Sequence, residues 1–214
     1  GVVSPSAVLQ KYYYPLEEAR ADLFSLYFML DPKLIELGLL PSLDAGKAAY
    51  QNTVTKGLLK QLARIELGQD ISDSHMRDRH LIASWAYEKG QTDNVIEKII
   101  KEGKTYYVIN DYQKLRGLFA QLLGEVQRII SEADYEAGKA LVERYGIKIN
   151  KDLHREVLDR WAKLGVAKYS LFLMPYMKPV LEGDKLVDVI LEYPTDFVEQ
   201  MMLFGSQYSF LPAM

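Results

Sequence analysis

The chain has 214 residues, of which 49% are hydrophobic and 26% are charged, and its net charge is -3. This composition is typical of a globular protein with a sizeable core and excludes a disordered or collagen-like chain. The slight acidity argues against a general nucleic-acid binder, whose affinity depends on a positive surface. Since the sequence has no cysteine, disulfides, thiolate catalysis and cysteine-ligated zinc or iron–sulfur sites are excluded.

The apolar runs of the sequence are short. Leu23–Leu30 and Leu171–Pro175 are among the longest, far below the roughly 18–20 residues that cross a bilayer. We therefore expect no membrane partner. The absence of cysteine is compatible with a location in either the cytoplasm or the periplasm. No signal-peptide pattern opens the chain. Because it begins with Gly-Val-Val rather than with Met, we expect it to be a segment of a longer protein.

Hydrophobic periodicity and helix caps predict a mainly α-helical fold. The first strong apolar stripe lies within 16–30. Asp31 and Pro32 have the residue types of an N-cap and a first helical position, which predicts a short second helix that Gly38 ends. Further helices are expected, most of them ended by glycine, at 41–65, 74–89, 94–102, 111–130, 132–145 and 151–164.

Two parts of the chain have β-strand character. Thr105–Ile109 is β-branched and aromatic, and predicts a short strand. The segments 178–181 and 186–193 flank Glu-Gly-Asp-Lys and predict a β-hairpin, followed by a last helix that Pro194 and Thr195 cap and that ends near Ser206. The change in pattern after Gly165 predicts two domains, a helical one over 1–165 and a smaller α+β tail over 166–214.

The segment Glu17-Glu18-Ala19-Arg20-Ala21-Asp22 is a candidate metal site. Glu18 and Asp22 are four residues apart, so they share one face of a helix. A carboxylate in the position of Glu18 can bind a metal, and a second acid one turn later can accept the outer N–H of a metal-bound histidine. Glu17 lies about 100° around the helix, free to touch a neighbouring group. The alternative is a solvated first helical turn, where acids interact favourably with the helix dipole.

The segment Ser74–His80 is a candidate catalytic element. His75 and Arg79 are four residues apart and share a face. A neutral histidine near a helix N-terminus can donate a hydrogen bond to a developing oxyanion, and an arginine one turn later can bind a carboxylate. The alternative is a packed, hydrogen-bonded histidine beside a surface arginine.

The other candidates are weaker. His154 is expected on a solvated helix start, and the tyrosines at 12–14, 106 and 107 are expected in the core or lining a cleft. The sequence has no glycine-rich phosphate loop, no Gly-x-Ser-x-Gly elbow and no His-Glu-x-x-His motif.

The two candidate segments, in this order and spacing, resemble the dipeptidyl peptidase III family of zinc-dependent exopeptidases. Members carry a Glu-Glu-x-Arg-Ala-Asp/Glu motif, which stands here at 17–22, and a His-Met-x-x-Arg helix, which stands here at 75–79. The resemblance extends over essentially the whole chain, as the carboxyl-terminal part of a longer protein. Position x of the acidic motif is often cysteine in other members and is Ala19 here, which should not affect ligation.

The resemblance implies a role for each matched residue. Glu18 would be a protein ligand of zinc, and Asp22 would orient a zinc-bound histidine. Glu17 would contact another histidine ligand or the water. His75 would support the tetrahedral transition state by hydrogen bonding, and Arg79 would hold substrate or the cleft geometry.

The resemblance also implies a function for the longer protein. It would release dipeptides from the N-termini of oligopeptides, with the helical part of this chain in the zinc-bearing lobe and the tail returning toward a second lobe. The family's His-Glu-x-x-Gly-His helix, which supplies two histidine ligands and the general base, is not in this sequence. We therefore expect this chain alone to be inactive and to bind zinc weakly or not at all. The alternative is a non-catalytic helical module that binds peptides or a partner helix.

Overall fold

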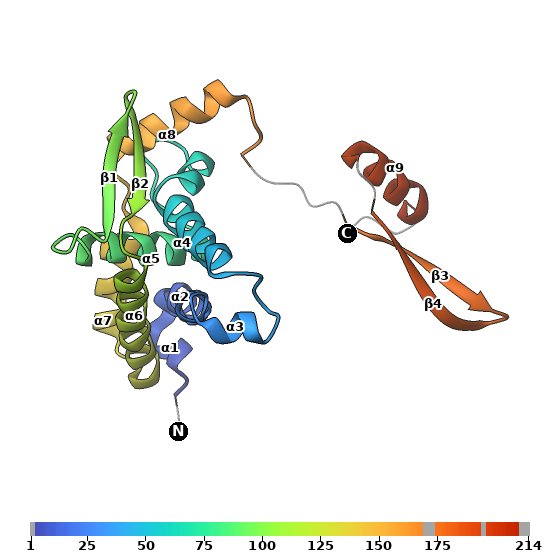
Figure 1. Cartoon of the computed structure of the whole chain (residues 1–214), viewed down its shortest axis with the longest axis horizontal. Helices are drawn as coiled ribbons and strands as arrows, with labels where there is room; N and C mark the ends of the chain where they lie inside the picture. Colours follow the sequence, from blue (N-terminus) through green and yellow to red (C-terminus); the bar gives the residue numbers. More distant parts are fainter. Residues whose placement is uncertain (1–2, 169–173, 194–195, 210–214) are drawn as a thin grey trace. The chain divides into compact units, whose positions relative to one another are not determined.

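The computed structural model describes residues 3–168, 174–193 and 196–209 (Figure 1). The chain is mainly α-helical with a carboxyl-terminal β-hairpin, as the sequence predicts. It divides into two units, Gly1–Val166 and Ala167–Met214, each described by itself. Within the described residues, none of the helices has both the length and the apolarity needed to cross a membrane.

The first unit is a bundle of helices with a small β-hairpin (Figure 1). Its helices and strands follow one another in this order: α1 Pro5–Leu9, α2 Tyr13–Phe28, α3 Pro32–Glu36, α4 Leu43–Leu58, α5 Ser74–Lys89, β1 Ile96–Lys101, β2 Lys104–Ile109, α6 Tyr112–Glu132, α7 Tyr135–Val142 and α8 Lys151–Leu164. Helix α2 packs against α5 and α6, and α4 packs against α5. These contacts place α2 and α5, which carry the candidate residues, side by side.

One core joins these helices, and the predicted apolar stripe of α2 is part of it. Leu16, Ala19 and Leu23 are fully buried and pack with Tyr50 of α4 and Phe119 of α6. The Tyr50 hydroxyl donates a 2.7 Å hydrogen bond to the carbonyl oxygen of Leu26, so the buried phenol is satisfied. Burial of this stripe fixes the rotation of α2 about its axis, and thereby the direction in which its acids point.

The boundaries of α5 and α8 agree with the predicted helices, because side-chain caps mark their first turns. Asp73 accepts a hydrogen bond from the backbone N–H of Met76, and Asn150 accepts two at the start of α8. Asp31 caps α3 in the same way. The last helix, α9 Phe197–Tyr208, is capped by Asp196, whereas the predicted cap, Pro194 and Thr195, lies outside the described residues.

Two predicted helices are shorter than expected. The helix expected over 41–65 ends at Leu58, because Leu59 leaves helical geometry, and a 3-10 turn follows at Lys60–Arg64. The helix expected over 132–145 is α7 alone, which begins after a left-handed Ala133 and runs into a π-helical turn at Glu143–Ile147.

The predicted helix over 94–102 is wrong, because most of this segment, Ile96–Lys101, is strand β1. It pairs antiparallel with β2, with Ile96 opposite Ile109 and Lys101 opposite Lys104. Glu102 and Gly103 make the turn, both with positive φ, as a tight hairpin of this hand requires. Gly103 is therefore a turn residue and not a helix stop, while the strand predicted at 105–109 is confirmed as part of β2.

The β1–β2 hairpin is attached to α8 through Glu156. Its carboxylate accepts 2.7 Å hydrogen bonds from both the backbone N–H and the hydroxyl of Thr105, and it pairs with Arg160 at 3.1 Å. Burial alone would raise the pKa of Glu156, but the hydrogen bonds from Thr105 and Arg160 outweigh it and lower that pKa. The ionised carboxylate thus stabilises the fold, and this contribution is lost as the pH falls through the lowered pKa.

We expect Glu156→Gln to lower the free energy of unfolding by about 1–2 kcal/mol at pH 7, since the amide cannot accept both Thr105 hydrogen bonds at full strength. Urea denaturation followed by circular dichroism measures this change. Glu136→Gln, at an exposed position of α7, is the matched control and should change stability by less than about 0.5 kcal/mol. Equal stability of the two variants would contradict the assigned role of Glu156.

The second unit consists of the antiparallel strands β3 Tyr176–Glu182 and β4 Lys185–Glu192, with helix α9. The hairpin confirms the sequence prediction. Gln200 of α9 donates a 2.7 Å hydrogen bond to the carbonyl oxygen of Met174, and Gln207 donates one of 2.6 Å to the hydroxyl of Tyr176. These two side chains connect the helix to the start of β3.

Candidate functional site

Glu18 of α2 and His75 of α5 lie side by side. Nδ1 of His75 is 3.2 Å from Oε2 of Glu18, and their side chains are 56% and 33% exposed. In the sequence the two residues belong to separate motifs, at 17–22 and 75–79. The packing of α2 against α5 brings them into one site at the surface.

Asp78 is a third member of this cluster and is not among the residues predicted from sequence. Its side chain is buried, at 1% exposure, and its Oδ1 has no hydrogen-bond partner in the part of the chain that the structure describes. One ligand atom from each of Glu18, His75 and Asp78 lies within 4.8 Å of the other two. The available signal was spacing, since Asp78 follows His75 by three residues and therefore shares its helix face. We call these three residues the α2–α5 cluster.

The carboxyl of Asp78 is strongly perturbed. Burial, assisted by the negative charges of Asp22 and Glu18 and opposed by Arg79, raises its pKa to about 8. An acid with a raised pKa in the folded state binds a proton that the unfolded chain, with a pKa of about 3.9, has released. Stability of the metal-free chain therefore falls as the pH rises from about 4 to about 8.

We expect Asp78→Asn to remove this loss and to stabilise the metal-free chain at pH 8 by about 1–3 kcal/mol, because an uncharged amide avoids the cost of ionising a buried carboxyl. At pH 4 the variant and the native chain should have similar stability, because both are then uncharged at position 78. Thermal unfolding across this pH range, in the presence of a chelator, measures the difference. A variant that is destabilised equally at both pH values would contradict the assignment.

Charged residues of three helices surround the cluster. The negative charge of Asp22 and the positive charge of Arg79 both act on Asp78. Lys56 of α4 faces the same residues. Burial, Arg79 and Arg64 lower its pKa, and the charges of Asp22 and Asp78 oppose that change. Asp22 and Arg79 therefore lie close enough to influence the cluster, although they are not members of it.

Glu17, the remaining predicted site residue, lies beside Arg20. The two side chains form an ion pair of 2.5 Å and are each about one third exposed (34% and 36%). The pair keeps the carboxylate of Glu17 on the surface of α2. The predicted contact of Glu17 with a histidine ligand or a water stays a prediction. Among the described residues, its side chain pairs with Arg20.

The other two histidines are structural. His80 is buried, and its ring nitrogens lie 2.9 Å from the carbonyl oxygen of Gly57 and 3.1 Å from that of Lys148. The prediction that His154 is solvated is wrong, because its side chain is 1% exposed. Its Nε2 lies 3.1 Å from the carbonyl oxygens of both Leu62 and Ile65, so the ring holds the 3-10 turn against α8. His75 is thus the one histidine of the three that belongs to the cluster.

The predicted tyrosines divide between core and surface. Tyr12 and Tyr107 are buried, whereas Tyr14 is 65% and Tyr106 is 37% exposed. The hydroxyl of Tyr12 donates a hydrogen bond to Glu143.

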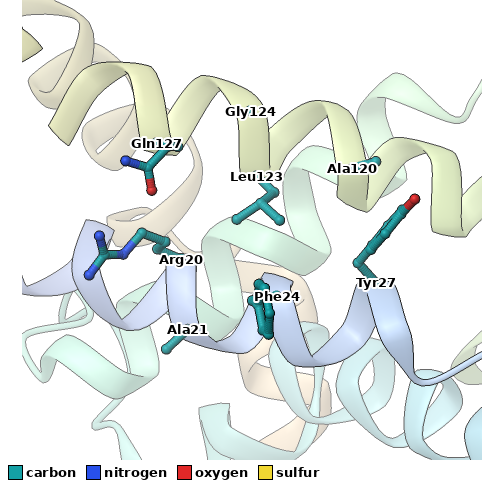
Figure 2. Close-up of a pocket in the computed structure, with 8 residues that line it drawn as sticks. All are labelled: Arg20, Ala21, Phe24, Tyr27, Ala120, Leu123, Gly124 and Gln127. Atoms are coloured by element: carbon teal, nitrogen blue, oxygen red, sulfur yellow. The ribbon is translucent and has the colours of Figure 1, made fainter. Parts of the chain in front are cut away.

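A groove of about 690 Å³ lies between α2 and α6 (Figure 2). Figure 2 shows Tyr27 of α2 reaching toward Ala120 of α6, Leu123 of α6 pointing toward α2, and Arg20 and Gln127 at one end. Phe24 is 59% exposed, so the groove presents apolar surface. None of the α2–α5 cluster lines it.

The α2–α5 cluster offers carboxylate oxygens and an imidazole nitrogen. These are the ligand types that zinc prefers when no thiolate is present. His75 is also exposed enough to donate a hydrogen bond to a bound molecule. Scans of protein-family models and of curated proteins found no match to this chain.

Proposed function

We propose that this chain is the carboxyl-terminal part of a zinc-dependent exopeptidase that releases dipeptides from the N-termini of oligopeptides. The observation that carries the proposal is the convergence of Glu18 and His75, each from a separate motif, at 3.2 Å. This contact brings the acidic motif of α2 and the histidine motif of α5 to one place on the surface. Such an enzyme would act on free oligopeptides in the cytoplasm or the periplasm.

The residues present fit a zinc ion. Oδ1 of Asp78 is a buried acceptor without a partner, a feature that costs stability unless a cation or donor compensates it. Glu18 is half-buried beside it, and its carboxylate is a ligand type that zinc accepts. In the proposed enzyme Glu18 holds the metal, together with two histidines from another part of the polypeptide.

Zinc, when bound, would polarise the scissile carbonyl and lower the pKa of a water molecule. His75 donates a hydrogen bond to the oxygen on which negative charge develops, which requires its ring to be accessible, as it is at 56% exposure. Asp22, one turn beyond Glu18, orients a histidine ligand by accepting its outer N–H. Arg79 binds a carboxylate of the peptide or maintains the cleft, and Glu17 contacts a histidine ligand or the water.

The chain by itself lacks part of this machinery. Of its three histidines, two are buried against backbone carbonyls, so they cannot complete a catalytic zinc site with three protein ligands and an open position. The general base is a glutamate of the family motif that this sequence does not contain. We therefore propose that the 214-residue chain is inactive, and that its partners are oligopeptide substrates and the rest of the polypeptide.

The test is an assay of the protein translated from the reading frame extended upstream of Gly1. We expect release of dipeptides from the N-termini of short oligopeptides, loss of activity on treatment with a chelator, and restoration by zinc. The 214-residue chain, assayed in parallel, should show no activity. If the upstream frame encodes no paired histidines, or the extended protein leaves the peptides intact, the proposal is wrong.

A second candidate is a non-catalytic module that binds peptides. The groove between α2 and α6 favours it, because the exposed Phe24 lines the groove and packs against the exposed Phe28, with tilted rings whose centroids are 4.9 Å apart. In this case an amphipathic peptide would protect Phe24 and Tyr27, and Phe24→Ser would abolish binding without affecting the α2–α5 cluster.

A further inference from the structure

We propose that Lys56 of α4 and Arg79 of α5 together bind a carboxylate of the peptide substrate. This rests on the proposed function, in which Arg79 alone either binds a carboxylate or maintains the cleft. The proposal assigns Arg79 to the first of these roles and adds a second cation from a different helix. Lys56 is not among the residues predicted from sequence, because no pattern within α4 connects it to the two motifs.

The first argument is the position of the two cations. Helices α4 and α5 are in backbone contact at Gly57, where a Cβ atom would lie 2.4 Å from the carbonyl oxygen of Arg79. Lys56 directly precedes Gly57 in α4, so both basic residues belong to this contact between the helices. The positive charge of Arg79 acts on the ammonium group of Lys56. The packing of two helices thus holds two like charges near each other.

The second argument is that the described chain leaves both side chains unpaired. Lys56 and Arg79 are each half-buried, so part of their hydration is lost. Within residues 3–168, 174–193 and 196–209, neither side chain forms an ion pair or a hydrogen bond. A charge that is partly removed from water is destabilising unless an opposite charge compensates it. A bound anion would supply that compensation for both cations at once.

The third argument is the local balance of charge. Burial and the charges of Arg79 and Arg64 lower the pKa of Lys56. The acids Asp22 and Asp78 oppose this change but do not reverse it. Since the pKa of Asp78 is itself raised to about 8, this carboxyl is mostly uncharged at neutral pH. The electrostatic potential around the ammonium of Lys56 is therefore positive, which favours a negatively charged ligand.

The chemistry of the pair and its place beside His75 indicate which anion binds. A guanidinium presents a planar set of donors that matches a carboxylate, and an ammonium adds a compact second charge. Arg79 lies one helical turn from His75 on the same face of α5, so a peptide whose reacting carbonyl lies at His75 extends toward both cations. Lys56 therefore favours peptides with a carboxylate beyond the cleaved bond, either the C-terminus or an Asp or Glu side chain.

The first experiment compares three peptides as substrates of the extended protein: an oligoalanine with a free C-terminus, its C-terminal amide, and the amide with one Asp after the cleaved bond. We expect the free acid to be preferred over the amide by about tenfold in kcat/KM, mainly through KM. Lys56→Met should reduce this preference to less than about twofold. Lys60→Met, at an exposed position of the following 3-10 turn, is the matched control and should keep the native preference. The Asp-containing amide shows whether a side-chain carboxylate serves as well as the C-terminus.

The second experiment needs no catalysis and uses the 214-residue chain. Its lysines are labelled by reductive ¹³C-methylation, which keeps their charge, and the resonance of Lys56 is identified by its loss in Lys56→Met. Titration with acetyl-trialanine should shift this resonance, whereas acetyl-trialanine amide should not, and the resonance of Lys60 should respond to neither.

The two experiments separate this proposal from the proposed function. The role of Lys56 is overturned if its resonance does not respond to the free acid, or if Lys56→Met keeps the native preference between acid and amide. Either result leaves the peptidase proposal standing. If the extended protein cleaves none of the peptides, the peptidase proposal is wrong, and the titration alone then decides whether Lys56 and Arg79 bind a carboxylate.

Discussion

In the extended protein, Glu18→Gln is expected to lower kcat/KM for dipeptide release by at least about 10³-fold, because the amide is a poor zinc ligand and the metal supplies several kcal/mol of transition-state stabilisation. The zinc content of the purified variant should fall in parallel. His75→Gln should lower kcat by about 10²–10³-fold with little change in KM, as for loss of a donor that acts mainly in the transition state.

The matched control for these variants is Glu136→Gln on the surface of α7, which removes the same charge at a position outside the cluster. It should retain both activity and zinc. If Glu18→Gln also retained full activity and full zinc content, Glu18 would not be a ligand, and the acidic motif would be the solvated helix turn of the alternative interpretation.

Replacing Gly57 by alanine is expected to lower the free energy of unfolding by about 2–4 kcal/mol, because α4 and α5 are in backbone contact at this position. A Cβ atom at Gly57 would lie 2.4 Å from the carbonyl oxygen of Arg79 and 2.7 Å from Cβ of Ala83. Neither neighbour can yield cheaply, so the helices must separate. That separation would displace the segment of α5 that carries Asp78.

Gly117→Ala in α6 is the matched control, since nothing lies within 4 Å of the position a Cβ would take there. This substitution should be neutral or stabilise the protein by up to about 1 kcal/mol, as alanine is the better helix former. Chemical denaturation of both variants gives the comparison. Similar stabilities would show that α4 and α5 adjust to the extra methyl group, contrary to the packing described above.

Local signals predicted most of the helices. α5 and α8 could be delimited from sequence because polar caps, apolar spacing and a terminal glycine agree at both. The segment 94–102 could not, since Ile-Glu-Lys-Ile-Ile-Lys fits a short helix as well as a strand. Its pairing with β2 and the positive φ of Glu102 decide between them, and neither is encoded in a periodicity.

The site was predictable in part for the same reason. Spacing placed Glu18 with Asp22, and His75 with Arg79, because each pair lies on one helix. The distance between Glu18 and His75 depends on how α2 packs against α5, which no local pattern reveals. The burial of Asp78 and His154 likewise comes from other helices covering them. An aspartate or histidine near a helix start is usually exposed, so both were assigned to the surface or overlooked.

The β3–β4 hairpin has a consequence for how the stability of this chain is measured. Each residue of β4 is exposed, and a two-stranded sheet with so little covering is only marginally stable in water. The buried hydrophobic core, as far as the structure describes it, lies in the first unit. A melting curve therefore reports on the first unit, and a single free energy does not characterise the chain. Amide hydrogen exchange distinguishes the two, because strands that open locally exchange their protons long before the helical core unfolds.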